Sequence, residues 1–405
     1  MSDSLDSRYS WMRLALSLGI ATVGNAGMWS IIVIMPAVQA EFEVGRSEAS
    51  LPYTLTMVGF ALGNLVIGRA VDRVGVAKAL AAAALLSTLG YGLAVISGSI
   101  LMLSLAQAVV GLGTAAFFGP LIADISLWFR RKRGIAVAIA ASGNYLAGAI
   151  WPVLLSGVLA EQGWRAVYLT LGVLVTIVVV PATALLRRRL PETSLSAAAQ
   201  ATSVTQRRVP FSPAVLMWIL AAAGVACCVA MSMPQVHLVA MSVDLGFGPK
   251  VGAELLSVML LGGVVSRLIS GLIADKLGGI PTLLIGSVGQ VIGLALYLPS
   301  EGLTSLYLVS LFFGLSQGGI VPAYAIIVRE YMPAKEAGAR VGFVLMATIA
   351  GMALGGWMSG WIYDMTGSYE LAFINGIIWN AANISIMLVI LFSGRPGKTL
   401  RPAAA

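Results

Sequence analysis

Long apolar stretches alternate with short polar clusters along the whole chain. A transmembrane helix needs about 20 apolar residues, so we place the boundaries at charged clusters and at Gly and Pro breaks. Twelve spans result, at residues 13–37, 49–70, 77–97, 101–127, 134–159, 165–187, 213–240, 252–274, 281–299, 304–329, 338–363 and 370–393. The pattern predicts an all-α membrane protein with twelve transmembrane helices.

The composition agrees with this pattern. Of 405 residues, 59% are hydrophobic and only 10% are charged, which excludes an ordinary soluble domain. The basic residues behind the net charge of +8 lie in short loops and do not alternate with aromatic residues. They therefore indicate membrane topology rather than a nucleic-acid partner. Cys227 and Cys228 are adjacent in an apolar run and no metal-ligand spacing occurs, so we expect no metal and no other cofactor.

A polar segment divides the spans into two sets of six. Residues 188–212 are rich in Ser, Ala, Thr, Gln and Arg, so we predict a mobile cytoplasmic linker there. The N-terminal six-helix half is then residues 1–187, and the C-terminal half is residues 213–405 with a short cytoplasmic tail. The first apolar stretch is longer than a signal-peptide core, so we expect it to be retained as a span.

The basic residues predict the orientation in the membrane. If the N-terminus is cytoplasmic, only Arg46, Arg165 and Lys250 lie on the outer side, and Arg267 lies within a span. Every other Lys and Arg falls on the cytoplasmic side, as the positive-inside rule requires. We therefore predict a multi-pass protein of a cell membrane with both termini cytoplasmic, and we expect the bacterial inner membrane.

One loop motif occurs twice. Residues 68–75 read GRAVDRVG after span 2 and residues 271–278 read GLIADKLG after span 8, so both fit G-x-x-x-D-[RK]-x-G. Two copies at equivalent places indicate an internal repeat, a common construction of carriers. With twelve spans and a central linker, the motif resembles the signature loop of the major facilitator superfamily. This resemblance covers nearly the whole chain and implies a fold of two pseudo-symmetric six-helix bundles.

The repeated motif also supplies candidate gate residues. Asp72, which precedes Arg73, is predicted to pair with Arg340 at the start of span 11. By the same symmetry, Asp275 is predicted to pair with Arg133 at the start of span 5. These pairs would hold the cytoplasmic side closed. The alternative is that the charges only fix the topology.

The start of span 5 indicates a narrower family. Residues 128–143 read WFRRKRGIAVAIAASG, an aromatic pair and a basic cluster followed by small residues, and this resembles the monocarboxylate transporter signature. Residues 237–246 and 360–369 add further similarity. Close helix packing alone would also explain the small residues. The chain departs from the family pattern in two places: span 1 lacks the acidic residue of the family signature, and position 263 is Gly where animal members have Asp. Oxalate/formate exchangers are similar carriers that have a lysine in span 11, but span 11 of this chain has none. The resemblance therefore implies a monocarboxylate more than a dicarboxylate.

Arg267 is the charged residue predicted to lie deepest within a span. It is about two helical turns from the cytoplasmic end of span 8, where an Arg costs about 3 kcal/mol to insert. No acid is predicted at a similar depth, although Asp124, Glu254 and Glu330 come closest to the interior. An unpaired guanidinium is suited to bidentate binding of a substrate carboxylate.

The family resemblance implies the same role for Arg267, because the span 8 arginine of monocarboxylate transporters binds the substrate carboxylate. Gly263 and Ser270, one turn to either side on the same face, are expected to leave room for the ligand. The alternative is a structural arginine that pairs with backbone carbonyls.

Other polar residues in apolar spans are weaker candidates for substrate contacts, and interhelical hydrogen bonding is an equal alternative for each: Asn25, Asn144, Tyr145, Gln317 and Tyr324. The only histidine, His237, lies in the outer third of span 7 and is a candidate for proton coupling, since imidazole titrates near neutral pH. A histidine held by a neighbouring helix is the alternative.

Together these features predict a secondary active transporter of a small organic anion, preferably a monocarboxylate, that works in the lipid bilayer by alternating access. We expect a monomer, and proton symport is left open. No nucleotide-binding loop or catalytic constellation occurs, so no enzyme is expected. Two alternatives stay open: a carrier of a larger neutral or aromatic solute, such as a vitamin or a drug, and a non-transporting membrane sensor.

Overall fold

A computed structural model describes residues 5–188 and 209–393 of the chain. Residues 1–4, most of the predicted linker (189–208) and the predicted tail (394–405) lie outside the described residues. Within the described ranges the chain is helical and forms no strand. Twelve of its helical stretches are long and apolar enough to cross a membrane, and each coincides with one predicted span. The prediction of an all-α multi-pass membrane protein with twelve spans is therefore confirmed.

The helices of the first six spans are α1 (Arg8–Gly24), α2 (Ala26–Phe42), α3 (Arg46–Val74), α4 (Val76–Val95), α5 (Ile100–Thr114), η1 (Ala115–Phe117), α6 (Gly119–Trp128), α7 (Arg133–Gln162), α8 (Trp164–Leu174), η2 (Val175–Val179) and α9 (Val180–Ala184). Those of the last six are α11 (Pro213–Asp244), α12 (Gly248–Leu277), α13 (Gly279–Tyr297), α14 (Leu303–Gln317), α15 (Ile320–Tyr331), α16 (Ala334–Thr366) and α17 (Glu370–Ser393).

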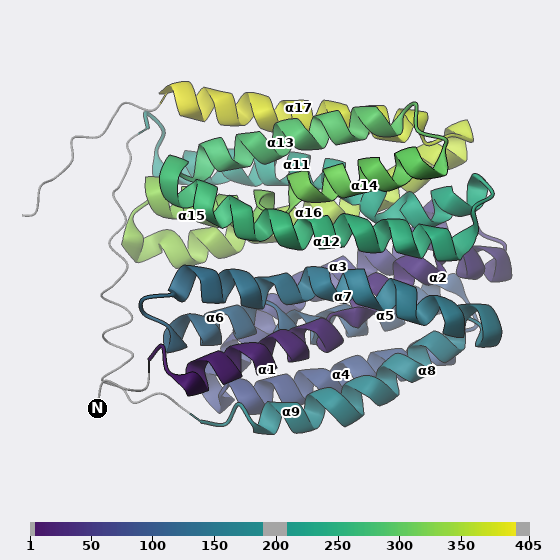
Figure 1. Ribbon diagram of the computed structural model, residues 1–405, viewed down its shortest axis with the longest axis horizontal. Helices are drawn as coiled ribbons and strands as arrows, with labels where there is room; N and C mark the ends of the chain where they lie inside the picture. The colour runs from purple at the N-terminus through teal and green to yellow at the C-terminus, as the bar shows by residue number, and fades with distance from the viewer. Residues whose placement is uncertain (1–4, 189–208, 394–405) are drawn as a thin grey trace, which may run out of the picture.

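The helices form two groups that lie side by side, α1–α9 and α11–α17 (Figure 1). Because the spans alternate in direction, the loops gather at two ends of the bundle. The basic end carries the loops around residues 75 and 130, and the opposite end carries the loops around residues 45, 245 and 367. Apolar side chains such as Leu62, Ile177 and Phe392 are exposed on the outside of the bundle, where lipid contacts a membrane protein.

Four spans are interrupted where the sequence predicted continuous helices. Span 1 breaks at Asn25, span 4 passes through the 3-10 turn η1, span 6 contains the π-helical η2, and span 10 breaks at Gly318 and Gly319. At Asn25 the side-chain Nδ2 donates to the backbone oxygen of Ala21 at 2.7 Å, so it competes with the helix for its own carbonyl. In span 6 the cause is a proline after η2, which offers no N–H to the preceding turn.

Glycines allow two equivalent helix pairs to pack closely, one in each half. A Cβ at Gly111 of α5 would lie 2.0 Å from the backbone oxygen of Thr56 in α3, and one at Gly314 of α14 would lie 1.9 Å from that of Met259 in α12. Gly314 follows Gly111, and Met259 follows Thr56, by the same 203 positions that separate the two loop motifs. The internal repeat read from the motif therefore extends to the packing of the helices.

We predict that Gly111→Ala destabilises the protein, because the added methyl group forces α3 and α5 apart. Overpacking of this kind costs about 1–3 kcal/mol. Gly92→Ala in α4 is the matched control, since its Cβ would meet no atom within 4 Å. Thermal unfolding of the two purified variants in detergent measures the difference. Equal melting temperatures for both would contradict the packing described here.

Candidate functional site

Arg267 links the two halves of the molecule. Its side chain belongs to α12 in the second half. Its Nη1 donates across the boundary to the backbone oxygen of Ala141 in α7, at 2.7 Å. Its Nε donates to the backbone oxygen of Gly318 at 3.2 Å, at the break between α14 and α15. The residue is 6% exposed. The break in span 10 thus provides a carbonyl that a continuous helix would have used for itself.

The ring of Tyr145 lies against this guanidinium. The guanidinium carbon is 4.1 Å from the centre of the ring, a cation–π contact in which Tyr145 comes from α7 and Arg267 from α12. Gly263 makes the contact feasible, because a Cβ there would lie 3.0 Å from two carbons of the Tyr145 ring. The expectation that Gly263 leaves room for a ligand is therefore wrong in this conformation: the tyrosine ring occupies that space.

The acids nearest the interior are engaged elsewhere. Asp124 forms a two-bond ion pair with Arg13, at 2.8 and 2.9 Å, within the first half. Glu330 accepts from the backbone N–H of Gly279, and Glu254 accepts from Tyr307. Among the described residues no carboxylate pairs with Arg267. The guanidinium is therefore a buried cation held by neutral groups, and its Nη2 has no carbonyl or carboxylate partner in the described ranges.

The position in the first half that is equivalent to Arg267 by the internal repeat holds a neutral residue. Arg267 follows Asn64 by the same 203 positions that relate the loop motifs. The Nδ2 of Asn64 donates to the backbone oxygen of Phe60 in its own helix, α3. At the break in span 4, the free carbonyl of Phe117 accepts a hydrogen bond from the Nδ2 of Asn25 at 3.2 Å. Both halves therefore cap a broken helix with a side chain, but only the second half does so with a cation.

Of the weaker candidates, only Tyr145 contacts Arg267 directly. Gln317 directly precedes Gly318, and its Oε1 accepts a hydrogen bond from Gln235 of α11. Asn144 accepts from the indole nitrogen of Trp29. Tyr324 lies in a separate buried network, in which its hydroxyl donates to Asn383 of α17 at 2.7 Å. Asn25 supports the helix breaks of the first half, as described above.

His237 lies toward the opposite end of the bundle rather than at Arg267. It is fully buried in α11, and its Nε2 is 2.7 Å from the backbone oxygen of Gly356 in α16. Its Nδ1 has no partner among the described residues. Its ring centre is 5.7 Å from that of Tyr369.

A charged cluster at the opposite end joins the halves, and the sequence did not reveal it. The Nη2 of Arg46 at the start of α3 bonds both oxygens of Asp244 in α11, at 3.1 and 2.9 Å. Asp364 of α16 accepts from the backbone N–H groups of Arg46 and Ser47 and so caps α3. The guanidinium also lies over the ring of Tyr363 at 4.8 Å. We call Arg46, Asp244, Asp364 and Tyr363 the opposite-end latch.

The predicted gate pairs at the basic end are not formed in this structure. Arg340 pairs with Glu336 one turn away in α16, and Arg133 donates to Ser126. For Asp72, Arg73 and Asp275 the described part of the chain provides no hydrogen-bond or ion-pair partner. On the basic side of Arg267 no hydrogen bond joins the described residues of the two halves.

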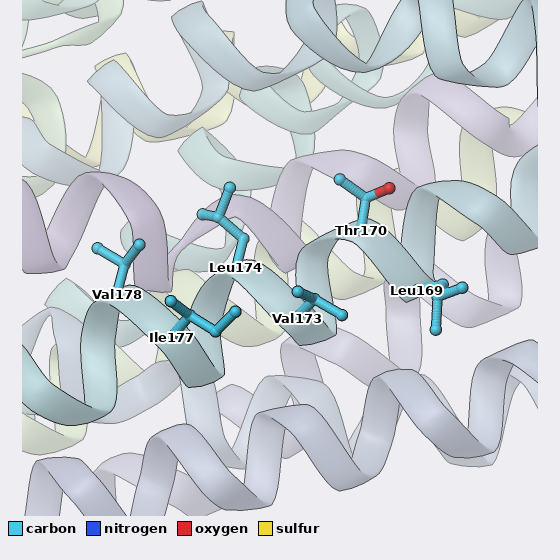
Figure 2. Close-up of a pocket in the computed structure, with 6 residues that line it drawn as sticks. All are labelled: Leu169, Thr170, Val173, Leu174, Ile177 and Val178. Atoms are coloured by element: carbon cyan, nitrogen blue, oxygen red, sulfur yellow. The ribbon is translucent and has the colours of Figure 1, made fainter.

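A surface hollow along α8 and η2 is not part of this site. It is lined by Leu169, Thr170, Val173, Leu174, Ile177 and Val178 (Figure 2). Its one polar side chain, Thr170, bonds the backbone oxygen of Ala166 in its own helix. Most of the lining side chains are exposed on the outside of the bundle, so the hollow is a lipid-facing feature of span 6.

Comparison with known proteins agrees with this architecture. The sequence matches the Major Facilitator Superfamily over residues 17–303 and 228–405. It is 28% identical over 375 residues to monocarboxylate transporter 13 of Bos taurus, covering 91% of this chain and 86% of that protein. It is 28% identical to monocarboxylate transporter 13 of Rattus norvegicus, covering 98% and 93% of the two chains. MFS-type transporter 1 of an Ophiocordyceps species is 24% identical, covering 75% and 67%.

We predict that Arg13→Met destabilises the protein much more than Arg267→Met. The first change leaves the mostly buried Asp124 carboxylate, whose side chain is 13% exposed, without its partner, and breaking a buried pair in this way costs about 3–5 kcal/mol. The second leaves only neutral carbonyls and a tyrosine ring. Thermal unfolding of both variants in detergent compares them. A loss at Arg267→Met as large as at Arg13→Met would indicate that Arg267 has a charged partner after all.

Proposed function

Because this chain belongs to the major facilitator superfamily and is a membrane transporter rather than an enzyme, we propose that it carries a small monocarboxylate by alternating access. The observation that supports this most strongly is Arg267, a buried cation without a carboxylate partner among the described residues, at the boundary between the halves. A substrate carboxylate would supply the missing negative charge. The resemblance to monocarboxylate transporters favours the same substrate class.

The proposed cycle uses contacts from both halves. Arg267 belongs to the second half, but Ala141 and Tyr145 belong to the first, so an anion bound at the guanidinium competes with contacts that join the halves. We propose that the basic end faces the cytoplasm, by the positive-inside rule. The present conformation, joined by the latch at its opposite end, is then inward-facing. The Asp72–Arg340 and Asp275–Arg133 pairs stay proposals for the outward-facing state.

Proton symport is included in the proposal, and His237 is the candidate group. It is the only histidine of the chain, and its Nδ1 is buried without a partner in the described ranges. It lies against the latch, where Tyr369 contacts both His237 and Arg46. A proton on His237 would place a second cation beside Arg46 and so favour release of the latch.

Uptake into proteoliposomes tests the substrate assignment. We expect wild-type protein to accumulate labelled lactate or pyruvate, and to do so faster with an inward proton gradient. Arg267→Met is expected to lower uptake at least about 100-fold, because truncating one partner of a desolvated charge pair costs about 3 kcal/mol or more. Asn64→Met, at the repeat-related position, is the matched control and should retain transport. If wild-type protein moves no monocarboxylate although it is folded, a larger neutral or aromatic solute becomes the leading substrate.

Cysteine labelling tests the latch. In a Cys227→Ala/Cys228→Ala background, Thr54→Cys places a thiol in α3 where Thr54 bonds the backbone oxygen of Ala353 across the halves. Arg46→Gln is expected to raise its labelling by an impermeant maleimide several-fold, because the outward-facing state gains population.

The control for this experiment is Arg165→Gln. Arg165 is another outer basic residue, but it pairs with Glu41 within the first half. Its replacement should leave the labelling rate of the Thr54→Cys thiol unchanged. Equal labelling rates for the Arg46 and Arg165 variants would mean that the Arg46 cluster does not set the balance between the two states.

A further inference from the structure

Two buried amide side chains meet beside the break in span 10 that Arg267 caps. Gln317 is the last residue of α14, and the residue after it, Gly318, accepts the hydrogen bond from Arg267. Gln235 follows Pro234 in α11, and its Nε2 donates to the Oε1 of Gln317 at 2.7 Å. Gln317 is 0% exposed and Gln235 is 1% exposed. The amide pair therefore lies at the depth of Arg267, between α11 and the break in span 10.

This single hydrogen bond leaves one donor and one acceptor unused. The Oε1 of Gln235 and the Nε2 of Gln317 have no partner among the described residues. Exchanging nitrogen and oxygen in both amides does not change this count, since one carbonyl and one NH2 group always remain. Buried polar groups in native proteins nearly always find partners, so an unpaired donor next to an unpaired acceptor needs an explanation.

Another buried glutamine provides a comparison. Gln290 of α13 is fully buried and donates from Nε2 to the backbone oxygen of Cys227 at 3.3 Å. Only its Oε1 is unpaired in the part of the chain that the structure describes. It therefore offers an acceptor alone, and its described hydrogen bond goes from α13 to α11. The combination of donor, acceptor and nearby cation belongs to Gln235 and Gln317.

We infer that Gln235 and Gln317 select a carboxylic acid that also carries a hydroxyl group. A hydroxyl donates one hydrogen bond and accepts another, so it matches both unused groups at once, whereas a ketone oxygen only accepts. With the carboxylate at Arg267, a hydroxyl on a nearby carbon would have to reach the amide pair, which adjoins the Gly318 carbonyl that Arg267 binds. This inference rests on the proposed function, because it requires the carboxylate to bind at Arg267, and it adds the substituent that the carrier distinguishes.

The experiment compares uptake of two matched pairs of acids that differ only by a hydroxyl: lactate with propionate, and 3-hydroxybutyrate with butyrate. Wild-type protein is expected to prefer the hydroxy acid of at least one pair by about tenfold, the equivalent of about 1.4 kcal/mol, since the plain acid makes neither hydrogen bond to the amides. The Gln235→Leu/Gln317→Leu double variant removes both amides together. It should lose the preference, so that the two acids of each pair are taken up at similar rates. Gln290→Leu is the control and should keep the wild-type ratio.

The possible results separate this inference from the proposed function. Wild-type uptake of all four acids without preference, or a preference that persists in the double variant, overturns the inference alone. Wild-type uptake of none of them overturns both. If the double variant does not fold, Gln317→Asn shortens one side chain and keeps its amide. In that variant a preference reduced by about tenfold supports the inference, and an unchanged preference overturns it.

Discussion

A guanidinium held by carbonyl oxygens and an aromatic ring, with no carboxylate among its described neighbours, is the interaction on which the proposed mechanism depends. Placing an arginine at this depth is costly, and Arg267 recovers part of the cost from Ala141, Gly318 and Tyr145. These are neutral groups that leave the net charge in place. A carboxylate in the described core would neutralise it, as Asp124 does for Arg13. The structural role of Arg267 and its proposed binding role are therefore compatible, because the carbonyls fix the side chain while the charge stays available.

The repeat explains how a symmetric scaffold acquires an asymmetric site. The close contacts of Gly111 and Gly314 recur at equivalent positions, so both halves pack in the same way. Both halves also break a helix and bond the freed carbonyl with a side chain. The equivalent of Arg267 in the first half is Asn64. One duplicated scaffold thus provides two similar breaks, capped from different helices: Asn25 of span 1 caps the first, and Arg267 of span 8 brings a cation to the second.

The sequence predicted the spans because twelve apolar segments and the basic loops are one-dimensional signals. It did not predict the break at Asn25 or at Gly318, because an asparagine or a glycine pair also occurs in unbroken transmembrane helices. Contacts with the neighbouring helices determine whether the helix breaks at such a residue. Arg267 was found because a lone charge in an apolar run is conspicuous. The opposite-end latch was missed because Arg46, Asp244 and Asp364 lie near helix ends, just outside the predicted spans, and their contact depends on how spans 2, 7 and 11 pack. Gln235 was missed for a related reason, since its meaning comes from its contact with Gln317.

Equilibrium binding of a labelled acid and its uncharged amide to the purified protein tests the role of Arg267 most directly. Lactate and lactamide have nearly the same size and share the hydroxyl group, so they differ mainly in the charge that the guanidinium is proposed to recognise. Saturable binding of lactate, with no competition from lactamide at 100-fold excess, is the result we predict for wild-type protein. Competition by lactamide at concentrations similar to those of lactate would contradict recognition of the anion and leave Arg267 as a structural link between the halves.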